Sequence, residues 1–265
     1  MPSARHSTTV DGIPAIWMPP QVDADRRTLA VWLTGLSGWK ELTVPTLERF
    51  AELGFFALSI DAFEHGERLR DSREQLAQRA DTAFRRTMWP TLGRTVLDVM
   101  HVAYWVIDTY DLGASIVAGG VSMGGDIAVA LAGIDHRVTR VAAIAATPDW
   151  ARPGMRRATD PFDVVAQGLQ SAEGALLRRW LDPAQHPDRF ARRPAVAFEL
   201  GGDDCHIPAE HAKAFARAVA DVDHAAMRRI VVTVHPGLDH AQSTSDPLLL
   251  ERAIAWMARS DPGQA

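Results

Sequence analysis

The sequence contains one cysteine, no long apolar run and no large excess of charge of either sign, and each absence excludes a class of protein. A single cysteine, Cys205, cannot form a disulfide within the chain, which fits a reducing compartment. No apolar run approaches the roughly 20 residues that span a bilayer. Residues 1–9 are polar and lack the apolar core of a signal peptide. We therefore expect a cytoplasmic protein that does not bind a membrane.

The charge is nearly balanced. Lys and Arg total 28, Asp and Glu total 33, and the formal net charge is −5. The basic residues occur as scattered pairs, such as Arg85-Arg86 and Arg192-Arg193, and form no cluster. This distribution argues against a nucleic-acid-binding surface. Hydrophobic residues make up 47% of the chain, which is enough for a sizeable core in one large domain or two small ones.

Short β-rich apolar runs alternate along the chain with longer segments of helical period. This alternation is typical of an α/β fold, a mostly parallel sheet flanked by helices. We predict eight strands, of which the first two form a hairpin at residues 7–18 with its turn at Asp11-Gly12. The other predicted strands are 28–34, 55–60, 114–118, 138–146, 195–200 and 229–235, and the predicted helices are 41–53, 92–110, 123–132, 208–220 and 246–259.

The alternation stops between Thr147 and Arg193, where five prolines and two tryptophans occur without a predicted strand. We interpret residues 148–193 as a small helical cap inserted into a single domain that spans 1–265. An ordinary long crossover helix is the alternative. We find no repeat, low-complexity tract or linker.

A motif of chemical interest lies between the strand predicted at 114–118 and the following helix. Gly120-Val121-Ser122-Met123-Gly124 has the pattern G-x-S-x-G. A Ser on a sharp turn between a strand and a helix has a strained backbone, and glycines on both sides allow the neighbouring chains to pass closely. The turn exposes the hydroxyl and places the Met123 amide at a helix N-terminus, where it can stabilise an oxyanion. Ser122 is therefore the candidate nucleophile, and a glycine-rich turn with a capping Ser is the alternative.

A Ser nucleophile needs a base, and the base needs an acid to orient it. In enzymes with this motif the acid and then the His follow the Ser along the chain. The turn Gly201-Gly202-Asp203-Asp204 follows a late strand and supplies two carboxylates. We favour Asp204 as the acid, because it lies just before Ile207-Pro208, where the next helix begins. Asp203 is the alternative.

The loop after the last predicted strand supplies two histidines, His235 and His240. His235 lies at the end of the strand, where its side chain can simply be packed. His240 follows a turn at Gly237, which allows its imidazole to reach over the strand ends. We favour His240 as the base. A metal site is disfavoured, because no two of its candidate ligands form a tight pair on one helix; the candidates are Asp203, Asp204, His206, His235 and His240. We expect no metal and no cofactor.

The surroundings of the nucleophile follow from the other loops at the strand ends, where open α/β sheets bind ligands. The loop at residues 34–40 is glycine-rich, so the Leu36 amide is the candidate second oxyanion donor beside Met123. In the segment Asp61…His65-Gly66-Glu67-Arg68, we favour mutual hydrogen bonds that order the loop over direct contact with substrate. The candidate pocket residues are Trp39, Phe63, His65, Trp89 and Trp150, although tryptophans occur equally in cores.

Taken together, these segments resemble the α/β-hydrolase superfamily. The likeness rests on Thr34-Gly35-Leu36-Ser37-Gly38, the G-x-S-x-G at Ser122, Gly202-Asp203-Asp204…Ile207-Pro208 and Gly237…His240, and covers roughly residues 10–259. The His65-Gly66-Glu67-Arg68 stretch and Trp89-Pro90…Asp98 resemble small bacterial carboxylesterases related to dienelactone hydrolases and prolyl-oligopeptidase-like (S9) enzymes. The resemblance implies the triad Ser122, Asp204 and His240, with the Leu36 and Met123 amides as oxyanion hole.

The chain departs from this pattern at two positions. Members often carry His-Gly where this chain has Thr34-Gly35, and dienelactone hydrolases proper use Cys where this chain has Ser122. We therefore expect a carboxylesterase-like serine hydrolase that acts on a small-molecule ester, and we leave a homodimer open. The alternatives are a peptidase, thioesterase or acyltransferase with the same triad, or a non-catalytic ligand-binding protein with this fold.

Overall fold

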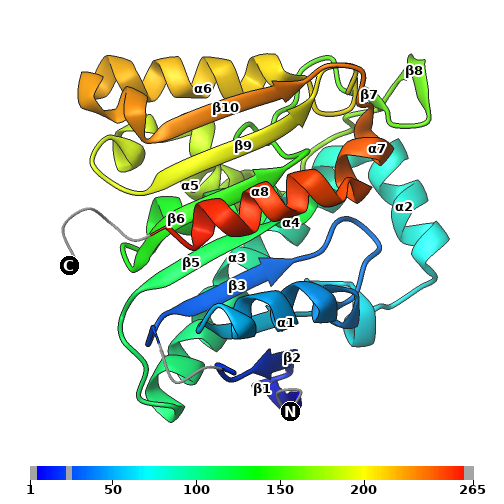
Figure 1. The fold of residues 1–265 in the computed structure, drawn as a ribbon. Helices are drawn as coiled ribbons and strands as arrows, with labels where there is room; N and C mark the ends of the chain where they lie inside the picture. Colours follow the sequence, from blue (N-terminus) through cyan, green and yellow to red (C-terminus); the bar gives the residue numbers. More distant parts are fainter. Residues whose placement is uncertain (1–4, 22–25, 260–265) are drawn as a thin grey trace.

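In the computed structural model, which describes residues 5–21 and 26–259, eight strands form one sheet in the order β1-β2-β4-β3-β5-β6-β9-β10 (Figure 1). β1 and β2 pair antiparallel, as do β2 and β4, and the remaining neighbours are parallel. The mostly parallel eight-stranded α/β fold predicted from the sequence is confirmed. The ends of the predicted domain, 1–4 and 260–265, lie outside the described residues. The strands are β1 His6–Val10, β2 Ile13–Met18, β3 Leu29–Leu33, β4 Phe56–Ile60, β5 Ile116–Val121, β6 Val138–Ile144, β9 Ala195–Gly201 and β10 Ile230–His235.

Helices cover both faces of the sheet, with α1 and α8 in front of it and α3 and α4 behind it in Figure 1. In the described part of the chain, no helix has the length and apolar character needed to span a bilayer. The α-helices are α1 Val44–Glu52, α2 Arg73–Thr82, α3 Phe84–Thr109, α4 Met123–Ile134, α5 Ala172–Leu181, α6 Ala209–Val222, α7 His240–Ser245 and α8 Pro247–Met257, and the 3₁₀ turns are η1 Lys40–Thr43, η2 Gly66–Arg68, η3 Pro183–Gln185, η4 Pro187–Phe190 and η5 His224–Arg228.

The central strands are apolar at successive positions because both of their faces are buried. In β3, Leu29, Val31 and Leu33 pack into the cluster that contains α3, α4 and α6. Ala30 and Trp32 point to the other face, where they meet α1 and α8. The strand therefore contributes alternate side chains to two separate cores, and the sheet is rigid between them.

Because the central strands are parallel, the loops that follow them meet at one edge of the sheet. Figure 1 shows α2, α7 and the short hairpin of β7 (Arg156–Arg157) and β8 (Asp160–Val164) gathered at this edge, to which the parallel strands point. The turns after β3, β5, β9 and β10 carry Leu36, Ser122, Asp204 and His240, respectively. The topology thus brings together residues that are more than a hundred positions apart.

The structure corrects the predicted start of the long helix. We expected it to begin near Leu92, but α3 begins at Phe84 and continues through Pro90. A proline inside a helix removes a backbone hydrogen bond and costs about 3 kcal/mol. Buried side chains of the first turns offset this cost: Phe84 and Trp89 are at most 3% exposed, and the Trp89 indole N–H donates to the Trp150 carbonyl at 2.8 Å.

The strand before the nucleophile is also longer than predicted. β5 continues through Gly119 and Gly120, which pair with β3 and β6, whereas the sequence suggested that the turn begins there. Glycine is required at this point of the strand because of its neighbours. A Cβ at Gly119 would lie 2.6 Å from the Trp32 ring and 2.8 Å from the Ala142 carbonyl oxygen.

Residues 148–193, predicted to lack strands, contain the two-stranded hairpin of β7 (Arg156–Arg157) and β8 (Asp160–Val164) together with α5. Arg157 holds the hairpin by an ion pair with Asp163 at 2.7 Å. The hairpin was missed because it is short, polar and exposed. α5 packs along α3, where a Cβ at Gly174 would lie 3.2 Å from the Pro90 ring.

Candidate active site

Ser122 occupies a strained turn between β5 and α4. Its backbone has φ +52° and ψ −120°, a conformation that costs a non-glycine residue about 1–3 kcal/mol. Hydrogen bonds hold it on both sides: the Ser122 N–H donates to the Ile144 carbonyl at 2.8 Å, and the Asp126 N–H donates to the Ser122 carbonyl at 3.1 Å. The surrounding structure therefore fixes the hydroxyl at the end of the sheet.

The two glycines of the motif are required by close packing. A Cβ at Gly120 would lie 2.6 Å from the Gly124 carbonyl carbon, and a Cβ at Gly124 would lie 2.3 Å from the Leu33 carbonyl oxygen. Helix α4 therefore begins in direct contact with the backbone of β3. This contact explains the spacing of G-x-S-x-G in this chain.

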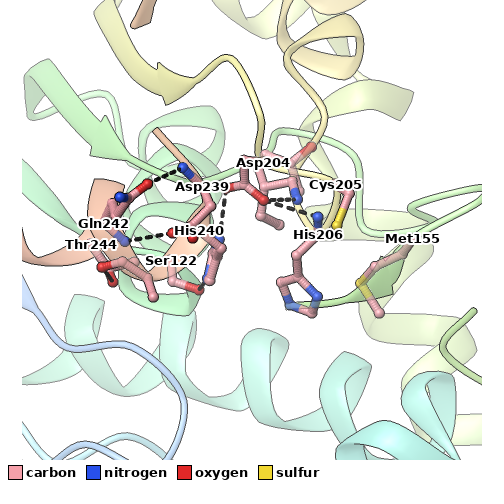
Figure 2. A network of polar contacts seen from close by, with 12 residues as sticks. Ser122, Met155, Asp204, Cys205, His206, Asp239, His240, Gln242 and Thr244 are labelled. Carbon is pink, nitrogen blue, oxygen red and sulfur yellow. Dashed lines mark hydrogen bonds and ion pairs between the residues drawn. The ribbon is translucent and has the colours of Figure 1, made fainter. Parts of the chain in front are cut away.

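The structure brings Ser122, His240 and Asp204 into one chain of hydrogen bonds (Figure 2). The Ser122 Oγ lies 3.2 Å from the His240 Nε2, and the His240 Nδ1 lies 2.7 Å from the Asp204 Oδ2. A carboxylate only accepts, so the Nδ1 carries the hydrogen and the Nε2 faces the serine as an acceptor. This is the tautomer that a general base next to a serine requires.

Asp204 is held as an ionised acceptor. Its side chain has no exposed surface, and its Oδ1 accepts the backbone N–H groups of His206 at 2.9 Å and Ile207 at 2.8 Å. Burial alone would raise the pKa of Asp204, but the hydrogen bond and charge of His240 and the Ile207 amide lower it below its usual value. The carboxylate therefore stays charged at neutral pH.

The loops that carry the acid and the base are tied to each other. The Asp203 N–H donates to the Leu238 carbonyl at 3.0 Å, and a Cβ at Gly201 would lie 2.2 Å from the same carbonyl oxygen. His240 is the first residue of α7, which begins with a reciprocal capping box between Asp239 and Gln242. These contacts set the direction of the imidazole.

The alternative acid and base lie outside the hydrogen-bond chain. Asp203 is exposed on the turn. The His235 Nε2 lies 2.6 Å from the Glu199 Oε2, and Arg252 contacts the same carboxylate at 3.0 Å. His235 is therefore part of a separate ion-pair group on the sheet.

Leu36 and Met123 line the cavity at Ser122, where both were expected as oxyanion donors. Met123 is the first residue of α4, and the first N–H groups of a helix have no partner within it. The loop that carries Leu36 is anchored through Lys40, whose buried ammonium contacts the Asp61 carboxylate at 3.1 Å and also pairs with Glu67. The loop geometry after β3 is therefore set by a carboxylate that follows β4.

The loop that contains His65-Gly66-Glu67-Arg68 is itself ordered by hydrogen bonds, but these run to Asp61 and Asp98 and not among His65, Glu67 and Arg68 as expected. The Asp61 Oδ2 accepts the Glu67 N–H at 3.0 Å, and Arg68 pairs with Asp98 on α3 at 2.6 Å. Gly66 has φ +53°, and a Cβ there would lie 2.1 Å from the Asp61 carboxylate.

A buried ion pair that we did not predict lies below the nucleophile. Asp126 and Arg152 are 0% and 3% exposed, and the Arg152 Nη2 contacts the Asp126 Oδ2. The Asp126 Oδ1 also accepts the Thr147 N–H at 2.7 Å. Thus the first turn of α4 is tied to the segment after β6. An Asp in an otherwise apolar helix could have indicated that a buried partner was needed.

The cavity at Ser122 is small, with a volume of about 30 Å³. A single water molecule needs about 10–15 Å³ of such space. A larger cleft of about 680 Å³, lined by residues such as His136, Arg189 and Arg192, lies near the start of β6, away from Ser122. We assign the site by its chemistry rather than by size. The small cavity is lined by Leu36, Ala80, Asp81, Phe84, Met88, Ser122, Met123, Arg152, Met155 and His206.

The five predicted pocket residues are not among this lining, and the prediction is corrected. Trp89, on α3, and Trp150 are 2% and 0% exposed, because both pack in the hydrophobic core. His65 is buried by its own loop, where its Nδ1 lies 2.8 Å from the Phe63 carbonyl. Phe63 lines a different cleft, beside the start of α3, and Trp39 stacks against the Arg73 guanidinium. Large aromatic side chains were a poor guide to the pocket.

His206, expected from the sequence only as a disfavoured metal ligand, lies beside His240 (Figure 2). The centroids of the two rings are 4.8 Å apart, with an interplanar angle of 62°. Burial, the charge of Arg152 and the neighbouring His240 lower the pKa of His206 to about 4. Within the described ranges, no group of three His, Cys, Asp or Glu side chains is placed to hold a metal ion.

A model of the dienelactone hydrolase family matches residues 22–158. No curated protein matches the chain by sequence.

Solved structures share the fold at low sequence identity. TT1662 from Thermus thermophilus has a TM-score of 0.72 at 18% identity, over 98% of this chain and 100% of its own. A Mycobacterium tuberculosis puromycin-hydrolyzing peptidase has a TM-score of 0.69 at 17% identity, over 96% of this chain and 39% of its own. Esterase 2 of Thermogutta terrifontis, phosphonylated by sarin, has a TM-score of 0.60 at 18% identity, over 96% and 91%. At these identities the likeness establishes the fold alone.

The depressed pKa of His206 predicts a pH dependence of stability. In the unfolded chain this imidazole binds a proton below about pH 6.5, whereas in the folded chain it does so only below about pH 4. The unfolded state therefore binds more protons between these values, and the free energy of unfolding should fall as the pH is lowered through this window. In the wild type we expect this free energy to fall by an amount on the order of 2 kcal/mol across the window, and His206→Gln should abolish that fall. Urea unfolding at several pH values measures the free energy of unfolding.

Cys205→Ala serves as the control, because it changes the same turn without removing an imidazole. It should keep the pH dependence of the wild type. Equal slopes for the wild type and His206→Gln would contradict the assignment of a half-buried, neutral His206.

Proposed function

The chain belongs to the dienelactone hydrolase family, and we propose that it is a serine hydrolase that cleaves a carboxylic ester of a small molecule through an acyl-enzyme. The observation that carries the proposal is the continuous hydrogen-bond chain from the Ser122 hydroxyl through His240 to Asp204. The family assignment supports a hydrolase. The serine mechanism and the ester substrate are our inference from this chain of contacts.

In the first step, the Ser122 Oγ attacks the carbonyl carbon of the ester, and the His240 Nε2 takes the hydroxyl proton. The Asp204 carboxylate accepts the Nδ1–H of the same ring and stabilises the imidazolium that forms. The carbonyl oxygen becomes an oxyanion, which the amides of Leu36 and Met123 stabilise. Preorganised donors of this kind contribute about 2.7–4 kcal/mol each.

In the second step, the bond to the alcohol breaks and the leaving oxygen takes the proton from His240. Water then attacks the acyl-Ser122 ester with His240 again as base, and the acid product leaves with the serine restored. The strained backbone of Ser122 holds the hydroxyl in the attacking position before substrate binds. The same triad can serve a peptidase, a thioesterase or an acyltransferase, which differ in the leaving group and in the acceptor of the acyl group.

Ser122→Ala should abolish labelling by a fluorophosphonate probe and lower kcat for p-nitrophenyl esters by about 10⁶, because the nucleophile is lost. Mass spectrometry of peptides locates the adduct in the wild type. Ser37→Ala, in the nearby loop after β3, is the matched control and should be labelled as the wild type is. Substantial ester turnover by Ser122→Ala would rule out the acyl-enzyme mechanism.

The neighbouring carboxylates of the turn after β9 give a second test. Asp204→Asn should lower kcat by about 10⁴, because an amide no longer holds His240 in the required tautomer. Asp203→Asn should leave kcat close to that of the wild type, since this side chain is exposed. Steady-state kinetics on one p-nitrophenyl ester compares the two variants. The reverse order of effects would assign the acid to Asp203.

We also infer that residues 148–193 act as a cap over the site. Met155 and Arg152, from this segment, line the cavity. The segment is tied to α2 and α3: the Phe84 N–H donates to the Ala166 carbonyl at 3.1 Å, and Arg157 pairs with Asp81. Because the cavity is only about 30 Å³, we infer that these contacts loosen when an ester enters.

Arg157→Gln should speed the labelling of Ser122 by a long-chain fluorophosphonate about two- to fivefold, since a partly exposed ion pair contributes up to about 1 kcal/mol. High salt should have the same effect on the wild type. Arg156→Gln, in the same hairpin, is the control, because the Arg156 side chain bonds within the hairpin to the Pro161 carbonyl. Equal labelling rates for both variants and the wild type would contradict a cap held by Arg157.

A further inference from the structure

We propose that His206 selects esters that carry a hydroxyl group close to the ester bond, on the α-carbon of the acyl group or on the alcohol group. The inference rests on the proposed serine-hydrolase function and adds a specificity-determining residue to it. The observations that carry it are the orientation of the His206 ring, its place next to the triad and the unpaired buried donor of Arg152.

The tautomer of His206 follows from its anchor. The Nδ1 lies 2.7 Å from the main-chain carbonyl oxygen of Arg156. A carbonyl oxygen only accepts hydrogen bonds, so the Nδ1 carries the hydrogen. In the neutral ring the Nε2 is then an acceptor with a lone pair. The described residues give this Nε2 no hydrogen-bond partner.

The ring stays neutral at the pH where a serine hydrolase of this type works. Arg152 lines the same cavity, and its positive charge, together with burial, opposes protonation of His206. The neighbouring Asp204 acts in the opposite direction, but its carboxylate is already engaged by His240 and two backbone amides. The His206 Nε2 therefore remains a hydrogen-bond acceptor in the cavity at that pH.

This acceptor lies next to the reacting atoms. His206 and Ser122 line the same small cavity, and Figure 2 shows the His206 ring on the far side of His240 from Gln242. The ring packs against that of His240, whose Nε2 is 3.2 Å from the Ser122 Oγ. A group that His206 binds must therefore be attached close to the carbonyl that Ser122 attacks.

Arg152 supplies the complementary donor. Its side chain is 4% exposed, and its Nε has no hydrogen-bond partner among the described residues. The other lining side chains are mainly apolar, among them Leu36, Phe84, Met88 and Met155. The lining carboxylate of Asp81 is paired with Arg157. An acceptor and an unpaired donor beside a mainly apolar wall suit a group that both donates and accepts.

A hydroxyl is such a group. A carboxylate only accepts and would face the lone pair of His206, while the charge of Arg152 is already paired with Asp126. An ammonium would bring a second positive charge next to Arg152. An ester without a hydroxyl would leave both polar atoms unpaired, which sites of this kind discriminate against.

Three small esters test the proposal: ethyl glycolate carries the hydroxyl on the acyl side, 2-hydroxyethyl acetate carries it on the alcohol side, and ethyl acetate carries none. For each enzyme, kcat/KM for each hydroxy ester is divided by kcat/KM for ethyl acetate. The intrinsic reactivity of the esters cancels when these ratios are compared between variants. Protection of Ser122 from fluorophosphonate by glycolamide, relative to acetamide, gives a second readout that needs no turnover.

His206→Phe and His206→Leu remove the acceptor with side chains of different shape. We expect at least one hydroxyl ratio to fall about tenfold in both variants relative to the wild type. A fall for ethyl glycolate assigns the hydroxyl to the acyl group, and a fall for 2-hydroxyethyl acetate assigns it to the alcohol. His186→Phe is the matched control, because it also removes an imidazole bonded to a main-chain carbonyl but lies away from the cavity. Its ratios should equal those of the wild type.

Equal losses for all three esters in the His206 variants would overturn the proposal and make His206 a positioning residue for His240. Unchanged ratios and unchanged protection would overturn it as well. Labelling of the wild type separates these results from failure of the proposed function: if Ser122 reacts with the probe, the serine site stands and only the hydroxyl preference is in question. If it does not react, both fall.

Discussion

The turn at Ser122 is the constraint on which the rest of the site depends. A positive φ at a serine persists only where its surroundings leave no alternative. Here the start of α4 contacts the backbone of β3 through Gly124, and the Ser122 amide bonds to β6. The turn is therefore wedged between the two strands that flank β5. The rigid, doubly covered sheet maintains this strain, and the strain presents the hydroxyl to the base.

Charges buried around the turn extend its order to the neighbouring loops. Asp61 fixes the loop that carries Leu36 by way of Lys40, and Asp126 fixes the segment after β6 by way of Arg152. Breaking such a buried pair typically costs 3–5 kcal/mol, because the remaining charge has no partner. The loop that carries Leu36 and the cavity wall are thus held by electrostatic contacts made outside the proposed triad. Preorganisation of this kind lets an active site act on charge as it develops.

Local sequence pattern was enough to predict the candidate triad but not the residues around it. The order Ser, acid, His along the chain and the rhythm of strands and helices were enough to select Ser122, Asp204 and His240 as candidates. The pocket was not predictable in the same way. Trp89 and Trp150 were expected to line an apolar pocket, yet both lie in the core. His206 was considered only as a metal ligand and Arg152 not at all, because lone polar residues carry no local signal. The hairpin in the predicted cap was missed for a related reason. Its strands are short and polar and show no clear alternation of apolar and polar residues, and an ion pair between Arg157 and Asp163 holds them.

The sequence by itself determined the fold class, the strand-to-helix turn at the nucleophile and the chain order of the catalytic candidates. Each of these depends on short-range properties: apolar periodicity, glycine at points of close approach and the residues that open a helix. Only the tertiary structure decided which of two neighbouring carboxylates meets His240, which way the His206 lone pair points and how small the cavity is. Those features depend on contacts between loops that follow different strands, and the sheet brings such loops together irrespective of their separation along the chain.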